Sequence, residues 1–407
     1  MLRTPESAGL IPESQSGIER VVTQFANTFD LDDQTVGHLE QTRLAIRASR
    51  FSRWIQAYLP SLPTERRDPL QEACASVLSR RKEFALLLGA PPIGGLLNEC
   101  LRSSDPAWGL AMEANLLAAN GADLSAVLDA GLSATPVLAD RALVGGAWPS
   151  PSESVQAISE AHTLVALPCV GALFIDPFDL FVEDRADGAL LEHDIQRLRA
   201  GLGYLEVTGG AFASDVARTL QRVVPSVHRV AAYSATSQVM TGRAVVSLNH
   251  SPDALAEALV HEAQHSKLAM VIDSCAAAGA PLVQGNDLED LESPWRPDLR
   301  PAEGILHGCA SFLVVAEFWA RADDAGLGPH AYAQAWLRGD QVRRGLEVLL
   351  SSSRLTEAGE VVAAGFRLRV QDILNRGVPS RSVIDIVLAD ETRTWLDGRW
   401  SPPLVGG

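Results

Sequence analysis

Two histidines and a glutamate within five residues are the part of this sequence best suited to chemistry. Residues 261–265 have the pattern HExxH and lie in a stretch with helical periodicity. Residues four apart lie on one face of an α-helix, one turn from each other, so both imidazoles can bind one metal ion with Glu262 beside it. The pattern therefore predicts a metal site with His261 and His265 as ligands and Glu262 as a catalytic residue.

A third ligand is expected because catalytic metals usually keep three protein ligands. Metzincin peptidases continue HExxH as xxGxxH, but here Leu268 and Val271 stand at the Gly and final His positions. The next histidine along the chain is His307. Gluzincin peptidases instead take a glutamate from a later helix, for which the candidates are Glu303 and Glu317.

Helix geometry separates these candidates. His307 and Glu317 are ten residues apart, which on one helix means about 15 Å along the axis and about 80° around it, so one metal cannot take both. Gly304 and Gly308 permit close approach to His307, whereas Glu317 lies among large apolar residues and fits a buried or paired acid. We favour His307 over either carboxylate as third ligand, with Glu303 on the same face in a supporting role. The alternative for His307 is a histidine that only packs between helices.

Two arginines precede His307 in a segment stiffened by three prolines, residues 293–301. A guanidinium can grip a carboxylate through two hydrogen bonds, so Arg296 and Arg300 suit a carboxylate of a cosubstrate or of a peptide. The alternative, weighted equally, is that they pair with the acidic run at residues 287–292.

Segments 261–268, 293–301 and 304–308 together resemble a family of HExxH-motif proteins. These proteins are encoded beside ribosomally made, post-translationally modified peptides, and some are fused to radical-SAM enzymes. The resemblance is most specific over residues 250–320. It implies hydroxylation, at Cβ, of a residue in a precursor peptide, with Fe(II), 2-oxoglutarate and O₂. It also implies that His261, His265 and His307 bind the iron, and that Arg300 or Arg296 holds 2-oxoglutarate.

Two other interpretations stay open at this point. Three histidines depart from the two histidines and one carboxylate of common iron oxygenases, and HExxH is otherwise a peptidase motif. In a peptidase, Zn²⁺ would lower the pKa of a bound water and Glu262 would act as general base. The last interpretation is a noncatalytic helical scaffold in which the motif is accidental.

The composition argues against several other partners and locations. Lys and Arg number 34 against 50 Asp and Glu, a net charge of −16, whereas nucleic-acid binding depends on concentrated positive charge. The best apolar run, residues 163–175, is shorter than the roughly 20 residues that span a bilayer and contains Pro168. The N-terminus lacks a secretory signal pattern, and the five cysteines form no CxxC pair. We therefore expect a cytoplasmic protein with no nucleic-acid or membrane partner.

The elements that must position the site are mostly helices, because apolar residues recur three and four apart through most of the chain. Helices are expected at residues 31–59, 67–88, 107–120, 152–162, 188–203, 210–223, 252–273, 301–323, 330–351, 356–376 and 381–395. Extended segments are expected at residues 164–174, 228–234 and 243–249, the last two as a hairpin directly before the HExxH helix.

The resulting fold class is α+β, predominantly helical, with a small antiparallel sheet packed with the HExxH helix. Gly- and Pro-rich joints at residues 89–92 and 145–149 suggest a division of the chain. We predict an N-terminal helical region at residues 1–150 and an HExxH metal-binding catalytic region at residues 151–407.

Overall fold

The fold is α+β and predominantly helical, as the sequence predicted. The computed structural model describes residues 15–80, 84–85, 87–88, 91–102, 106–119, 155–158, 164–167, 169–170, 173–175, 192–226, 234–285, 288–327 and 329–396. Its helices are α1 (Gln15–Asn27), α2 (Asp33–Tyr58), η1 (Leu59–Ser61), α3 (Thr64–Ser79), α5 (Pro91–Arg102), α6 (Pro106–Ala119), α9 (Glu192–Val207), α10 (Ala211–Thr219), η2 (Gln238–Met240), α11 (Pro252–Ala277), α12 (Ala302–Asp324), α13 (Pro329–Ser351), α14 (Glu357–Leu374) and α15 (Arg381–Leu396).

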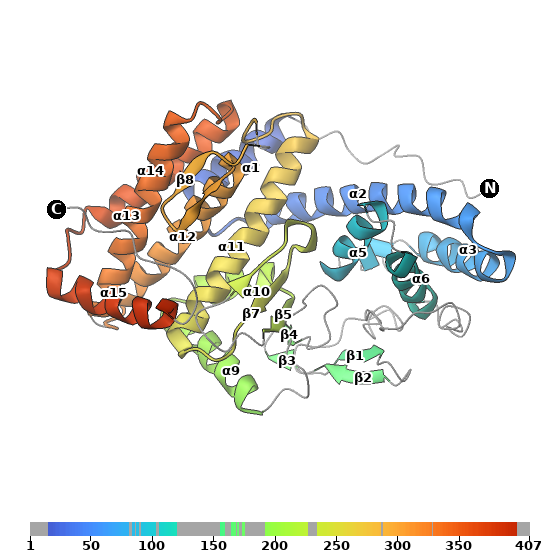
Figure 1. The fold of residues 1–407 in the computed structure, drawn as a ribbon, viewed down its shortest axis with the longest axis horizontal. Coiled ribbons are helices and arrows are strands. Elements are labelled where there is room, and N and C mark those ends of the chain that lie inside the picture. The colour runs from blue at the N-terminus through green and yellow to red at the C-terminus, as the bar shows by residue number, and fades with distance from the viewer. Residues whose placement is uncertain are drawn as a thin grey trace.

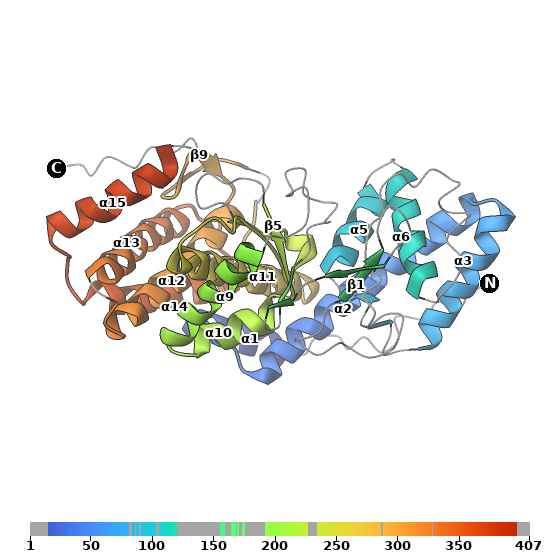
Figure 2. The same ribbon diagram turned by 90° about the horizontal axis from the view of Figure 1, so that it is seen from below.

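The helices gather in two groups that α2 connects. In Figures 1 and 2, α1 and α11–α15 form the larger group, and α2 runs from it to the smaller group of α3, α5 and α6. Asp32 begins α2 as its N-cap, because its carboxylate accepts a hydrogen bond from the Thr35 backbone N–H at 2.7 Å. The expected helix at residues 31–59 is thus confirmed.

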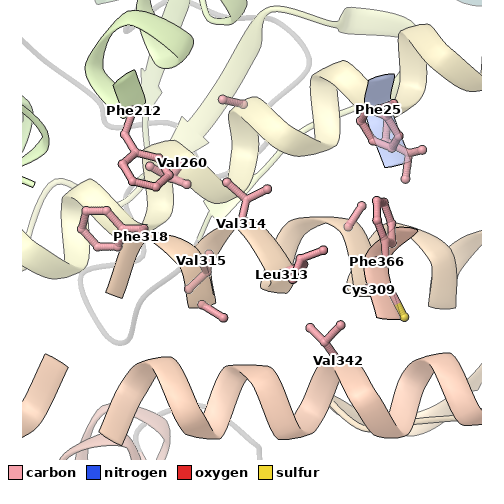
Figure 3. Close-up of a cluster of buried hydrophobic side chains, with 14 of the residues drawn as sticks. Phe25, Phe212, Val260, Cys309, Leu313, Val314, Val315, Phe318, Val342 and Phe366 are labelled. Atoms are coloured by element: carbon pink, nitrogen blue, oxygen red, sulfur yellow. The ribbon is translucent and has the colours of Figure 1, made fainter. Parts of the chain in front are cut away.

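The larger hydrophobic core surrounds α11 and α12. Figure 3 shows Val260 of α11 close to Phe212 and Phe318, whose rings meet edge to face with centroids 5.6 Å apart. Further along the same core, Phe25 of α1 packs against Phe366 of α14, with ring centroids 5.7 Å apart. Helix α1 therefore packs inside the core that holds the HExxH helix.

Helix α12 is the one described helix that is long and apolar enough to cross a membrane. Its apolar residues are buried within the larger core: Ile305, Leu306, Leu313, Val314 and Phe318 are all 0% exposed. Its hydropathy is therefore accounted for by packing against α11, α13 and α14.

A second, smaller core lies at the far end of α2. It contains Phe51, Trp54 and Ile55 of α2 together with apolar residues of α3, α5 and α6. Inside this group the carboxylate of Glu113, 0% exposed, accepts hydrogen bonds from Arg66 at 2.6 Å and from the Tyr58 hydroxyl at 3.1 Å. Most of the described residues up to 119 are helical, although helices α1 and α5 were not among those expected. The predicted division at residue 150 lies outside the described residues and stays a prediction.

A five-stranded sheet lies beside α11, in the order β3-β4-β5-β7-β6. The strands are β3 (Cys169–Val170), β4 (Leu173–Ile175), β5 (Arg222–Pro225), β6 (Ser234–Ala235) and β7 (Arg243–Val246). Strands β6 and β7 pair antiparallel, with Ser234 opposite Val246, which confirms a hairpin before the HExxH helix. The central pairs β4–β5 and β5–β7 are parallel, a feature that the sequence did not predict.

Two small hairpins complete the described structure. Strand β1 (Val155–Ile158) pairs with β2 (Leu164–Leu167), so the helix expected at residues 152–162 is wrong over β1, where the chain pairs as a strand instead. Strand β8 (Leu291–Ser293) pairs with β9 (Arg296–Arg300), which lies in the segment stiffened by prolines. A two-stranded sheet has free edges, so Pro297 fits in β9 without a backbone N–H to donate.

Candidate metal centre

The HExxH helix is buried except along the face that carries its histidines. Ser251 precedes α11 in extended conformation, and Pro252 occupies the first turn, where no backbone N–H is needed. His261 and His265 are half-buried, whereas the residues between them are buried. The fold therefore leaves both imidazoles at the open side of an otherwise enclosed helix.

His261 and His265 face each other through equivalent ring nitrogens. Their Nε2 atoms are 2.9 Å apart, with ring centroids at 4.6 Å. Two nitrogens bound to one metal at about 2.0–2.1 Å each lie about 3 Å apart. The pair thus fits one metal ion with no movement of α11.

His307 of α12 joins the same cluster through a different atom. Its Nδ1 lies 3.0 Å from Nδ1 of His265, so His265 contacts His261 with one ring nitrogen and His307 with the other. One metal bound by all three residues would require rotation of the His265 or His307 ring. Accordingly, no three His, Cys, Asp or Glu side chains converge on one point within the part of the chain that the structure describes.

The two competing carboxylates are engaged elsewhere. Glu317 receives two hydrogen bonds from Arg369, at 2.7 Å and 2.8 Å. Glu303 accepts a hydrogen bond of 2.5 Å from the amide of Gln238, and the same amide nitrogen lies 3.1 Å from His307 Nε2. Glu317 is therefore a paired acid, and Glu303 stands behind His307.

The surrounding protein favours neutral imidazoles in this cluster. Desolvation lowers the pKa of His265 to about 4 and that of His307 to about 3. The pKa of His261 falls well below its usual value, first through desolvation and then through electrostatic repulsion against protonation from His265, Arg338 and His307. Neutral imidazole is the form that binds metals.

Glu262 points its carboxylate into a buried site next to strand β6. It is 1% exposed, the side chains of Ser234 and Thr236 hydrogen-bond its carboxylate, and Oε2 has no hydrogen-bond partner. Burial raises the pKa of Glu262 to about 7, and those hydrogen bonds partly oppose the shift. One end of the carboxylate is thus held by the hairpin, while the other oxygen is unpaired.

The two arginines expected to hold a carboxylate both form an ion pair with Asp298, which lies between them in the sequence. Arg296 and Arg300 bind opposite oxygens of Asp298, at 3.1 Å and 2.7 Å. Within the described part of the acidic run, Asp290 binds Arg354 instead, at 2.7 Å. Among the described residues, no hydrogen bond or ion pair joins either arginine to the histidines.

Four residues that sequence reasoning missed surround the histidines. Phe312 presents its ring to His261 with centroids 4.8 Å apart, and Trp295 stacks on Phe312. The guanidinium of Arg338, buried on α13, lies 5.3 Å from the Phe312 centroid. Gln238 contacts His307 from the other side. Gln238, Phe312 and Arg338 have no fixed spacing from the motif, whereas Trp295 lies in segment 293–301, where only the arginines were expected to act.

Comparison with known proteins adds no identity. Protein-family models do not match the chain, and no curated protein matches it significantly.

Proposed function

We propose that this chain is a metal-dependent enzyme whose metal is held by His261, His265 and His307. The observation that supports this most is the contact between the three imidazoles, which two helices bring within 2.9 Å and 3.0 Å of one another. Three neutral imidazoles at a half-exposed face form a suitable donor set for a transition metal. The role of His307 requires only a ring rotation.

We further propose that the metal is Fe(II) and that the reaction is hydroxylation, at Cβ, of a residue in a ribosomally synthesised precursor peptide. Iron with 2-oxoglutarate and O₂ would supply the oxidation of the C–H bond. The binding of Glu262 by Ser234 and Thr236 supports this choice, because it gives the glutamate a role in tying α11 to the hairpin. We place the reaction in the cytoplasm, without nucleic-acid or membrane partners, on the composition alone.

Of the two proposed 2-oxoglutarate anchors, Arg300 fits better than Arg296. The Arg296 side chain is 62% exposed, whereas that of Arg300 is 31% exposed and has a buried Nε without a hydrogen-bond partner. To bind a carboxylate near His307, Arg300 must exchange Asp298 for the ligand.

A zinc peptidase is the second candidate, and one observation favours it. The unpaired Oε2 of Glu262 is the kind of atom that a general base needs to accept a proton from water. In this alternative His261, His265 and His307 hold Zn²⁺, and Glu262 activates the water. A scaffold without catalysis is the remaining alternative.

Metal content and turnover separate the three candidates. The purified protein is expected to bind about one metal ion per chain, and His261→Ala to lose it, while His330→Ala on α13 keeps it. With Fe(II), 2-oxoglutarate, O₂ and a precursor peptide as substrate, the hydroxylase is expected to yield succinate, CO₂ and a peptide heavier by one oxygen atom. If the zinc-loaded protein cleaves peptides and the Glu262→Gln variant does not, the peptidase is established instead. If the wild type and His261→Ala contain the same amount of metal, both enzyme interpretations are wrong and the noncatalytic scaffold remains.

A further inference from the structure

An acid continues the row of histidines on α11, one turn towards the N-terminus of that helix. Glu257 stands four residues before His261, so both side chains project from the same face of α11. The Glu257 carboxylate accepts a hydrogen bond of 2.7 Å from the indole of Trp319 on α12. His261 instead meets Phe312, seven residues earlier on α12. The two helices therefore run antiparallel here, and Glu257 lies one turn beyond the end of the histidine cluster.

A cation from α13 connects this acid with the histidine end of the contact. The Nη2 atom of Arg338 lies 3.2 Å from Oε1 of Glu257, and Nη1 donates to Oε1 of Gln341 at 3.4 Å. Its Cζ lies 5.3 Å from the ring centroid of Phe312, the residue that contacts His261. The Arg338 side chain is 11% exposed, so little water screens its charge. A fixed positive charge thus stands behind the aromatic ring that borders the first metal ligand.

The charge of Arg338 acts on the histidine nearest to it. The pKa of His261 is lowered first by desolvation, and Arg338 is among the charged groups that lower it further. A positive charge that opposes a proton on this imidazole also opposes a metal cation bound there. The same charge attracts a negatively charged ligand that binds to that metal. Arg338 is therefore expected to act oppositely on the metal ion and on its anionic ligand.

We infer that Arg338 makes the metal site selective for a ligand that carries a carboxylate, and that the same charge weakens binding of the metal ion itself. This inference rests on the proposed metal site at His261, His265 and His307. The carboxylate belongs to 2-oxoglutarate if the chain is a hydroxylase, and to the end of a peptide if it is a peptidase. Arg338 acts on either ligand through its charge, so it determines specificity from α13 without being a metal ligand.

The test measures two affinities that this charge shifts in opposite directions. Co²⁺ is titrated into the metal-free protein, and 2-oxoglutarate is then titrated into the Co²⁺ protein; the absorption spectrum of the ion reports both. Arg338→Met is expected to lower Kd for Co²⁺ about 10-fold and to raise Kd for 2-oxoglutarate about 10-fold. Arg338→Lys keeps the charge and is expected to stay close to the wild type.

A second variant on the other helix reverses the signs. Glu257→Gln removes the negative charge that partly offsets the guanidinium, so it is expected to raise Kd for Co²⁺ and to lower Kd for 2-oxoglutarate, each severalfold. Arg343→Met is the matched control, because it removes the same charge from the same helix, where Arg343 pairs with Asp340 and Glu347. Circular dichroism checks that each variant is folded.

Opposite shifts separate the effect of charge from loss of structure, because a loosened site would raise both Kd values. A peptide with a free C-terminal carboxylate is compared with the same peptide as its amide. If Arg338→Met weakens binding of the free acid alone and leaves 2-oxoglutarate unaffected, the carboxylate is that of a peptide. If Arg338→Met leaves every Kd unchanged, or raises the Kd for Co²⁺, the role of Arg338 is wrong. If His261→Ala binds Co²⁺ as tightly as the wild type, the proposed metal site is wrong and this inference fails with it.

Discussion

The indole of Trp295 lies flat on the ring of Phe312, with centroids 5.3 Å apart and planes 6° from parallel. Phe312 in turn meets the ring of His261. The indole fits because two helices lack a side chain where it lies: a Cβ at Gly308 of α12 or at Gly345 of α13 would come within 2.6 Å of it. The hairpin β8–β9 is thus fastened to the histidine cluster by one aromatic stack.

Adding a methyl group at Gly345 should break this stack. We expect Gly345→Ala to lower the free energy of unfolding by about 1–3 kcal/mol, because the indole must leave its slot. Gly339→Ala on the same helix is the control, since its Cβ meets a flexible Leu374 methyl at 3.3 Å. Urea unfolding of both variants measures the difference. Equal stability would show that Trp295 can move aside at no cost.

We expect Glu317 to stabilise the fold and to take no part in metal binding. Arg369 binds both of its carboxylate oxygens and also lies 3.4 Å from the Phe25 carbonyl oxygen, so the pair joins α12, α14 and α1. Glu317→Gln removes the charge and is expected to lower the free energy of unfolding by about 1–2 kcal/mol, while the metal content stays unchanged. Metal analysis and urea unfolding of the same sample give both answers. Loss of metal from a folded variant would return Glu317 to the list of ligands.

The buried pair of Lys267 and Asp215 should be costly to break on one side only. The ammonium lies 2.7 Å from the carboxylate and 2.7 Å from the Phe29 carbonyl oxygen, and both side chains are at most 5% exposed. Lys267→Met leaves a buried carboxylate without its counter-ion, which typically costs about 3–5 kcal/mol. Lys267→Met with Asp215→Leu is expected to recover much of this loss in thermal unfolding. If the double variant is as unstable as Lys267→Met alone, the lost stability comes from packing and not from the unpaired charge.

The cysteines of the smaller helical group should resist alkylation in the folded protein. Desolvation raises the pKa of Cys74 and of Cys100 to about 12, so at pH 8 about one thiol in 10,000 is ionised. The pKa of each thiol is higher in the folded than in the unfolded protein. Titration of these thiols therefore leaves the free energy of unfolding unchanged below about pH 8.5 and lowers it as pH rises toward 12. Mass spectrometry after iodoacetamide treatment, with and without urea, measures the protection. Rapid labelling without urea would show that the group opens easily.

Long amphipathic helices could be placed from the sequence, because their periodicity reflects burial on one side. The expected helices at residues 252–273, 301–323, 330–351, 356–376 and 381–395 match α11, α12, α13, α14 and α15. The helix expected at residues 210–223 is wrong over Arg222 and Val223, which begin strand β5 two residues after the end of α10. Pairing with β4 and β7, distant in sequence, decided its conformation.

The site divides in the same way between local and distant signals. His261 and His265 share one turn, so their spacing carries the information. Helix geometry made His307 and Glu317 alternatives, and the structure pairs Glu317 with Arg369. Gln238 reaches the site through a turn, and Arg338 through a separate helix, so neither has a fixed spacing from the motif. The sequence did not predict that Asp298, two residues from both Arg296 and Arg300 along one strand, binds both of them.

Helix α1 is synthesised before the other described helices, whereas its partner α14 begins 330 residues after α1 ends. Phe25 packs on Phe366, and the backbone of Ala26 lies so close to Gly365 that a Cβ there would be 2.5 Å from its carbonyl oxygen. The core around the histidines therefore cannot close until most of the chain has left the ribosome, and until then α1 has an exposed apolar face. The nascent protein should depend on chaperones, and an early stop in α14 should yield an insoluble product.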